Sequence, residues 1–308
     1  MIEQHNDDPH RLASAPVVVG VDGSEGSDVA LRWAIDLAVR RGRALQIVHG
    51  MDLVSATGAL GVSEVAAPPL VDSVRAHGRS VVAHAQATAR ELAPTLRTST
   101  VMTSDTGKQL LIDHSANAYM VVLGATGSAG TFAHLGTTLL SVVSRAAGVV
   151  AVVRPDPHAE NTIHDSGPVV VGVDGSLVSE AAIEAAFVEA AERGADLVAV
   201  HAWSDWDYGR FAGRSEPLLP DPTLEDAERV ILAERLAGWQ EKYPQVRVLR
   251  KVYPAAPAVH LQEWSTQAQL LVVGSRGRGG VLGMLLGSTS NSLVQHAYCP
   301  VLVAHSAR

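Results

Sequence analysis

The chain has 308 residues, of which 47% are hydrophobic and 18% are charged, so it is long enough for two domains with apolar cores. Its 24 Lys and Arg against 32 Asp and Glu give a net charge of −8, which argues against a general binder of nucleic acid or anionic membranes. The single cysteine, Cys299, excludes an internal disulfide and a cysteine-rich metal site, and it fits a reducing cytoplasm.

The sequence carries no signal for membrane insertion or export. Its apolar runs stay below the roughly 18 residues that a membrane-spanning helix needs. Residues 1–15 are polar, lack an apolar signal core and are expected to form a flexible N-terminus. We therefore expect a cytoplasmic protein with no membrane span and no nucleic-acid partner.

Strand-like and helix-like segments alternate along the first half of the chain. The apolar run at 17–22 is typical of a strand buried in a parallel sheet. Val29, Trp33 and Leu37 then recur at a spacing of four, which predicts a helix. The further elements expected here are a strand at 45–49, a loop containing Gly58, Gly61, Pro68 and Pro69, a helix at 71–92, a strand at 97–103, a helix at 108–117, a strand at 119–124, a glycine segment, a helix at 138–147 and a strand at 149–153.

The second half repeats this order. The sequence VVVGVDGS at 17–24 recurs at 169–176, and the end of the strand at 121–124 recurs in similar form at 271–274, with offsets of 152 and 150. A repeat of about half the chain indicates a duplicated domain. The elements expected in this half are a helix around Ile183 and Phe187, a strand at 197–202, a helix at 224–243, a strand at 246–252, a helix at 256–267, a strand at 270–274, a helix at 288–297 and a strand at 301–305.

The boundary between the halves falls where periodicity is lost and proline, asparagine and glycine gather. We predict a first domain at 16–154, a linker at 155–167 and a second domain at 168–308. Alternating strands and helices predict an α/β fold with a parallel sheet and right-handed crossovers in each domain. Ligands of such sheets bind beyond the carboxyl ends of the strands, where Asp22 and Asp174 are expected.

A glycine-rich segment, 274–280, follows the apolar strand of the second half directly. Gly287, Ser288 and Thr289 then open the next helix. Glycines leave backbone amides accessible, and a helix N-terminus favours a negative charge, so the pattern predicts a phosphate site. The alternative is an ordinary glycine-rich turn that binds nothing.

These residues resemble a known family. The pattern Gly274-x2-Gly277-x9-Gly287-Ser288 is similar to the ATP-binding signature of universal stress proteins, and the VGVDGS sequence of each half resembles their first strand and turn. The resemblance covers both halves and extends to segments of actinobacterial tandem members, such as 201–205 and 236–240. It implies two Rossmann-like domains, each with a five-stranded parallel sheet of order 3-2-1-4-5, and ATP as a cofactor, together with Mg²⁺.

The resemblance also assigns residues to the nucleotide. In the second half, the nucleoside is expected at Gly172, Asp174 and Asp205, and the phosphates at Gly274, Ser275, Arg276, Gly277, Arg278, Gly279, Gly280, Gly287, Ser288 and Thr289. The matching positions of the first half are Gly20, Asp22, Gly124, Ala125, Thr126, Gly127, Ser128, Ala129, Gly130, Gly136, Thr137 and Thr138. Asp22 and Asp174 could meet ribose hydroxyls or Mg²⁺, or simply shape the turn and cap the next helix.

The first half departs from the signature. Eight residues, not nine, separate Gly127 from Gly136, and Thr126 and Ser128 replace the two arginines, Arg276 and Arg278. Each charge-assisted contact to phosphate contributes roughly 1.5–3 kcal/mol. We therefore predict weaker ATP binding in the first half.

Other chemically distinctive residues have simpler interpretations. His49 and His201 end equivalent strands without a set of metal ligands around them in the sequence, which favours rings that are hydrogen-bonded locally. Cys299 enters an apolar strand and is expected to be a packed thiol. Trp203, Trp206, Tyr208 and Phe211 could cover an adenine, or could pack down as an ordinary loop.

The leading functional hypothesis is an ATP-binding regulator of stress response or growth arrest, with a homodimer and a protein partner of unknown identity expected. The alternatives are a slow ATPase or nucleotide-transfer enzyme, although no Walker lysine occurs, and a nucleotide-free dimeric scaffold. A classical NAD enzyme is disfavoured because the first turn of each half is not GxGxxG.

Overall fold

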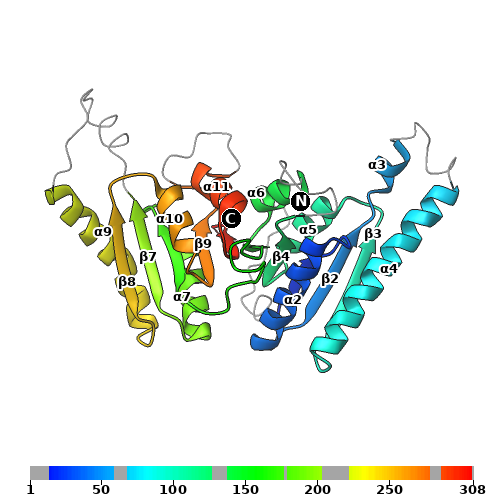
Figure 1. Cartoon of the computed structure of the whole chain (residues 1–308), viewed down its shortest axis with the longest axis horizontal. Helices are drawn as coiled ribbons and strands as arrows, with labels where there is room; N and C mark the ends of the chain where they lie inside the picture. The colour runs from blue at the N-terminus through cyan, green and yellow to red at the C-terminus, as the bar shows by residue number, and fades with distance from the viewer. Residues whose placement is uncertain are drawn as a thin grey trace, which may run out of the picture. The chain divides into compact units, whose positions relative to one another are not determined.

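The computed structural model describes residues 14–58, 68–126, 137–176, 179–202, 222–277 and 286–306 (Figure 1). The chain divides into two compact units, Met1–Val153 and Arg154–Arg308, here called unit 1 and unit 2. Among the described residues, no helix combines the length and apolarity needed to cross a membrane.

Unit 1 contains a five-stranded parallel sheet. Its strands are β1 (Val17–Gly20), β2 (Leu45–Gly50), β3 (Thr98–Thr103), β4 (Met120–Gly124) and β5 (Val149–Val153). They lie in the order β3-β2-β1-β4-β5, with β1 paired in parallel to both β2 and β4. The predicted order 3-2-1-4-5 is therefore confirmed, and the order reverses between β1 and β4.

The helices of unit 1 are α2 (Glu25–Arg40), α3 (Leu53–Gly58), α4 (Pro68–Leu92), α5 (Gly107–Ser115) and α6 (Thr137–Arg145). Helix α2 packs with α4, and α5 packs with α6. Because the strand order reverses, right-handed crossovers place these two pairs on opposite faces of the sheet. Strands β1, β4 and β5 are thus buried on both sides, which explains their continuous apolar runs, whereas β3 is partly exposed.

The loop expected after β2 contains a short helix, so that part of the prediction was wrong. Leu53 is buried and starts α3, and the Thr57 hydroxyl donates to the Leu53 carbonyl at 2.8 Å. Pro68 and Pro69 were assigned to the loop, but they form the first turn of α4. Proline is tolerated there because the first amides of a helix have no partner within the helix.

Unit 2 has the same architecture. Its strands are β6 (Val169–Val173), β7 (Leu197–Ala202), β8 (Val248–Tyr253), β9 (Leu270–Gly274) and β10 (Val301–Ala304), in the order β8-β7-β6-β9-β10. Its helices are α7 (Ser179–Arg193), α9 (Pro222–Lys242), α10 (Pro257–Ser265) and α11 (Ser288–His296). The strand order again reverses beside the first strand, between β6 and β9.

Helix α9 is held to unit 2 by large apolar side chains. Leu232 and Leu236 are fully buried. The rings of Trp239 and Tyr243 stack near Phe187 of α7, with ring centroids 6.2 and 5.9 Å from that of Phe187. These contacts anchor the helix independently of its polar residues.

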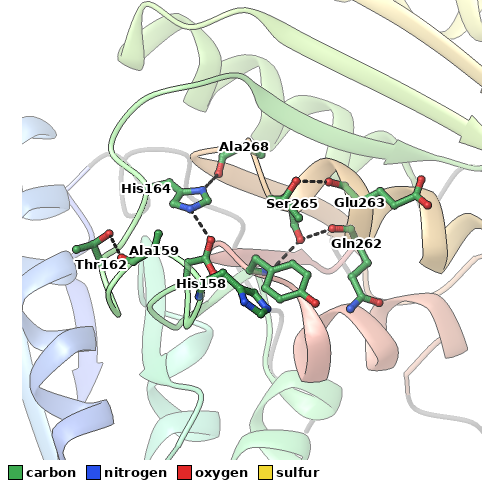
Figure 2. A network of polar contacts seen from close by, with 11 residues as sticks. His158, Ala159, Thr162, His164, Gln262, Glu263, Ser265 and Ala268 are labelled. Carbon is green, nitrogen blue, oxygen red and sulfur yellow. Dashed lines mark hydrogen bonds and ion pairs between the residues drawn. The ribbon is translucent and has the colours of Figure 1, made fainter.

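The first residues of unit 2, which follow β5, are hydrogen-bonded to the rest of that unit. Arg154 donates to the carbonyls of Val294 and Gln295 at the end of α11. Asp156 accepts from the His158 backbone amide at 2.8 Å and lies 2.9 Å from His164 Nε2. Figure 2 shows the His164 ring directed at the Ala268 carbonyl, 3.0 Å from Nδ1. The residues predicted as a linker, 155–167, thus include a hydrogen-bonded segment, here called the clasp, formed by Asp156, His158 and His164.

Cys299 lies next to this clasp and is fully buried. Burial raises the pKa of its thiol far above the ordinary value, and the nearby Arg154 offsets only part of that rise. The thiol is therefore protonated and inert in the folded chain, as expected for a packed cysteine.

The amino edges of the two sheets are built differently. In unit 2, Arg193 donates to Glu189 Oε2 at 3.0 Å and to Gln269 Oε1 at 3.1 Å, with the Glu189 and Arg193 side chains only 3% and 6% exposed. In unit 1, the position of Gln269 is taken by Tyr119, and the Arg43 guanidinium lies 3.9 Å from its ring centroid. Unit 2 therefore has a buried ion pair where unit 1 has a cation–π contact.

Candidate functional site

The turn after the first strand is shaped by an aspartate in both units. Asp174 Oδ1 accepts from the backbone amide and the hydroxyl of Ser176, at 2.9 and 2.7 Å. Asp22 makes the same two bonds with Ser24. The intervening glycines, Gly23 and Gly175, have φ of 79° and 73°, a conformation that favours glycine. Each aspartate thus has a structural role in its turn.

The loop after β9 returns to the start of α11. The Gly287 amide donates to the Ser275 carbonyl at 2.8 Å, and the Ser275 amide donates to Ala304 at 2.8 Å. A Cβ atom at Gly287 would lie 3.5 Å from Arg276 Cα and 3.7 Å from the Gly277 nitrogen. The two parts of the glycine pattern, Ser275–Gly277 and Gly287, are separated by the rest of the loop and yet lie against each other.

The start of α11 is left without a side-chain cap among the described residues. Gly287 occupies the cap position in an extended conformation. The Ser290 hydroxyl donates to the Gly274 carbonyl at 2.6 Å, so it faces β9 instead of the helix end. The first-turn amides of a helix carry partial positive charge, and here they adjoin the loop that contains Arg276, whose side chain is exposed.

Asp174 lies directly beside the same loop. A Cβ atom at Gly277 would be 2.6 Å from Asp174 Oδ2, which is closer than a real side chain could come. Position 277 therefore accepts only glycine while Asp174 keeps its place. The structure brings together Asp174, Ser275–Gly277 and Gly287–Thr289 at the carboxyl edge, next to the reversal of strand order.

Other residues assigned to the second-half site have different positions. A Cβ atom at Gly172 would lie 2.9 Å from Leu261 Cδ1 of α10, so the close packing of this helix accounts for the glycine. Gly20 has the same relation to Leu111 of α5, at 3.0 Å. Several further predicted residues lie outside the described residues: Asp205, Arg278, Gly279, Gly280, and the aromatic residues Trp203, Trp206, Tyr208 and Phe211.

The start of the corresponding loop in unit 1 is described as far as Thr126. A Cβ atom at Gly26, in the first turn of α2, would lie 2.0 Å from the Thr126 carbonyl oxygen. A Cβ atom at Gly124 would lie 2.3 Å from the Gly26 carbonyl oxygen. The start of this loop therefore presses on the N-terminal turn of α2. At the position of Gly26 the repeat of the second half has Val178, which lies outside the described residues.

The structure describes only some of the residues that were assigned to the first-half site. Ala125 donates from its amide to Val153 at 2.9 Å, as Ser275 does to Ala304. Thr138 is exposed in the first turn of α6, which begins at Thr137. Gly127, Ser128, Ala129, Gly130 and Gly136 lie outside the described residues.

Both strand-end histidines bond to the end of the neighbouring strand. His49 Nδ1 lies 2.7 Å from the Val21 carbonyl, and His201 Nδ1 lies 2.6 Å from that of Val173. In unit 2, Nε2 of His201 also lies 2.8 Å from Glu228 Oε2 of α9. The sequence analysis missed this carboxylate, although a shift of 150 residues relates Glu228 to Gly78 and so marks a difference between the repeats.

The described residues do not form a ready-made metal site. Within the described ranges, no three His, Cys, Asp or Glu side chains are grouped so that they could hold an ion. Asp174 presents one carboxylate beside the glycine loop. This fits Mg²⁺ that arrives with phosphate, because such ions keep several waters and need only one or two protein carboxylates.

Comparisons with known proteins agree with these features. The model of the universal stress protein family matches residues 14–154 and again 166–305. A universal stress protein of Mycolicibacterium smegmatis is 40% identical over 93% of this chain and 96% of its own length. One from Mycobacterium tuberculosis is 41% identical over 94% of this chain and 97% of its own. The crystal structure of a universal stress protein from Archaeoglobus fulgidus superposes with a TM-score of 0.67 at 18% identity, covering 95% of this chain and 98% of that one.

Proposed function

Because the chain belongs to the universal stress protein family, as a tandem of two such domains, we propose that unit 2 binds ATP at the carboxyl edge of its sheet. The nucleotide would arrive with Mg²⁺, and its presence or absence would regulate a stress or growth response. The observation that carries the proposal is the junction of Ser275–Gly277 with the uncapped start of α11, beside Asp174.

The junction suits a phosphate chain for three reasons. The first-turn amides of α11 have no side-chain cap, so an anion can accept their hydrogen bonds. Glycine at 277 and 287 allows close approach of the backbone. Arg276, and Arg278 further along the sequence, add positive charge next to these amides in a chain that is acidic overall.

Asp174 supplies the second part of the site. Its Oδ1 is committed to the turn through Ser176, whereas Oδ2 faces the loop at Gly277. A carboxylate in that position can accept from ribose hydroxyls or bind a magnesium ion that is already coordinated by phosphate.

Unit 1 is proposed to bind ATP more weakly. Its loop has fewer cations, is one residue shorter and rests on Gly26 of α2. Loss of one charge-assisted phosphate contact corresponds to about 10- to 150-fold in affinity. At moderate ATP concentration the chain would then hold one nucleotide, in unit 2.

Calorimetric titration of the full chain with Mg-ATP tests this proposal. Gly277→Ala places a Cβ atom at the Asp174 carboxylate, so the tighter binding event should weaken by tenfold or more. The matched control is Gly127→Ala, the equivalent position of the first half, which should leave that event unchanged. Retention of full affinity in a folded Gly277→Ala protein would overturn the assignment of the site.

Two further measurements address the alternatives. Phosphate release from ATP, compared between the wild type and Ser288→Ala, separates a binding protein from a slow ATPase. Mass spectrometry of small molecules released from the denatured native protein separates both from a nucleotide-free scaffold. The proposal expects adenine nucleotide in that extract and no phosphate release that depends on Ser288.

A further inference from the structure

We propose that Glu228 is a positioning residue of unit 2: through His201 it fixes the end of β6 and hence the turn that carries Asp174. This inference rests on the proposed nucleotide site for its functional consequence, although its structural part can be tested without nucleotide. It concerns His201 and Glu228, two titratable side chains in contact with each other. The apolar packing of α9 does not involve this contact.

The hydrogen-bond chemistry of the pair requires a shared proton. The Val173 carbonyl can only accept, so His201 Nδ1 carries a hydrogen and donates it. The other ring nitrogen, Nε2, lies 2.8 Å from a Glu228 carboxyl oxygen, a distance that two lone pairs would not keep. A proton therefore lies between Nε2 and Glu228, on one or the other. Imidazole and carboxyl side chains are 4% and 15% exposed, so water hardly competes for it.

The pair links α9 to the aspartate turn in two steps. Glu228 holds the outer side of the ring from α9, and the ring holds the carbonyl of Val173, the last residue of β6. Asp174 follows immediately and bonds to Ser176. An ordered ring therefore limits how far the end of β6 can rotate, and with it the direction of the Asp174 carboxylate beside Gly277.

Stability alone does not explain the pair. Buried ion pairs are weak sources of stability because desolvation offsets their attraction. Helix α9 is already anchored by Leu232, Leu236 and the ring stack at Phe187. Unit 1 keeps the equivalent histidine and its carbonyl partner with a glycine, Gly78, beside the ring: a Cβ atom there would lie 3.2 Å from His49 Nε2. The carboxylate is thus an addition in the unit whose glycine loop keeps the complete signature.

The structural arm of the test uses nuclear magnetic resonance of the full chain without nucleotide. Glu228→Ala should remove the signal of the proton held between His201 Nε2 and Glu228, and shift the amide signals of Asp174, Gly175 and Ser176. The matching amides of Gly23 and Ser24 in unit 1 serve as an internal control and should not move. Glu228→Gln should preserve the turn amides, because its amide group can donate to Nε2 of a neutral ring that still donates from Nδ1.

The functional arm measures Mg-ATP affinity of the same proteins. Glu228→Ala should weaken the tighter binding event by about three- to tenfold, the range expected for one lost hydrogen bond, and Glu228→Gln should restore most of it. If the wild type binds ATP and both variants bind equally well with unmoved turn amides, this inference fails and the proposed function stands. If the wild type binds no ATP, the proposed function fails and the turn amides decide the inference.

Discussion

The two units have the same sheet order and the same aspartate turn, and the described part of the loop after the fourth strand makes a different close contact in each. In unit 2 this loop lies beside Asp174, with Gly277 against the carboxylate. In unit 1 the Thr126 carbonyl occupies the space over Gly26 that a Cβ atom would fill. Strand pairing is thus preserved through duplication, while the loops at the carboxyl edge make different local contacts.

The amino edges differ in a comparable way. Glu189, Arg193 and Gln269 form a buried polar network in unit 2, and Arg43 and Tyr119 form a cation–π contact in unit 1. A buried charge that loses its partner costs far more than an exposed one. The two units should therefore respond very differently to single substitutions at matched positions.

The largest expected effect is at this buried pair. Glu189→Leu introduces the residue that unit 1 has at the matching position, Leu37, and leaves Arg193 buried without its carboxylate partner. We expect a loss of about 3–5 kcal/mol in the free energy of unfolding. Urea denaturation measures the loss, and alkylation of Cys299 reports on unit 2, because the protonated, buried thiol reacts only after that unit opens.

The control is an exposed ion pair of the same helical spacing in unit 1. Asp36 lies 2.8 Å from Arg40, with side chains 63% and 36% exposed. Asp36→Ala should change the free energy of unfolding by no more than about 0.5 kcal/mol. Similar losses for the two substitutions would show that the buried network does not distinguish unit 2.

A smaller effect is expected at the contact that sets the loop path in unit 1. Gly26→Ala places a Cβ atom 2.0 Å from the Thr126 carbonyl oxygen, so the loop must move, at a cost of about 1–3 kcal/mol. Gly107→Ala, in the first turn of α5, meets nothing within 4 Å and should be neutral or slightly stabilising. Thermal unfolding of both variants measures the difference, and equal stabilities would contradict the described loop path.

The smallest effect compares the two long helices. Gly238 is exposed within α9 with open space around it, so Gly238→Ala should stabilise the fold by about 0.5–1 kcal/mol through helix propensity. Gly78 lies within α4, where a Cβ atom would come within 3.1 Å of both His49 Cδ2 and Met102 Sδ. Gly78→Ala should therefore stabilise the fold less than Gly238→Ala does. An equal or larger gain at position 78 in chemical denaturation would show that the ring and the helix are not tightly packed.

Much of this architecture could be predicted because it depends on local patterns. The valine runs at 17–19 and 169–171 are fully buried in β1 and β6, and the repeat predicted both sheets. Helix α3 was missed because six residues show too little periodicity. In the candidate site, glycine spacing predicted that Gly277 and Gly287 would meet. The Glu228–His201 pair is a tertiary contact between side chains 27 residues apart, so only the comparison of the repeats could have suggested it.

The hydrogen bonds of Arg154 determine where the chain can be divided. Arg154 binds the last carbonyls of α11, and the Asp156–His164 pair reaches Ala268, so the second half begins before the region matched by the family model at residue 166. A protease that cut within 157–163 would break the peptide chain without breaking these hydrogen bonds. Arg154 and Asp156 would lie on the N-terminal fragment, and their partners in α11 and at His164 would lie on the C-terminal fragment. Nicking there would therefore not be equivalent to releasing two independent halves.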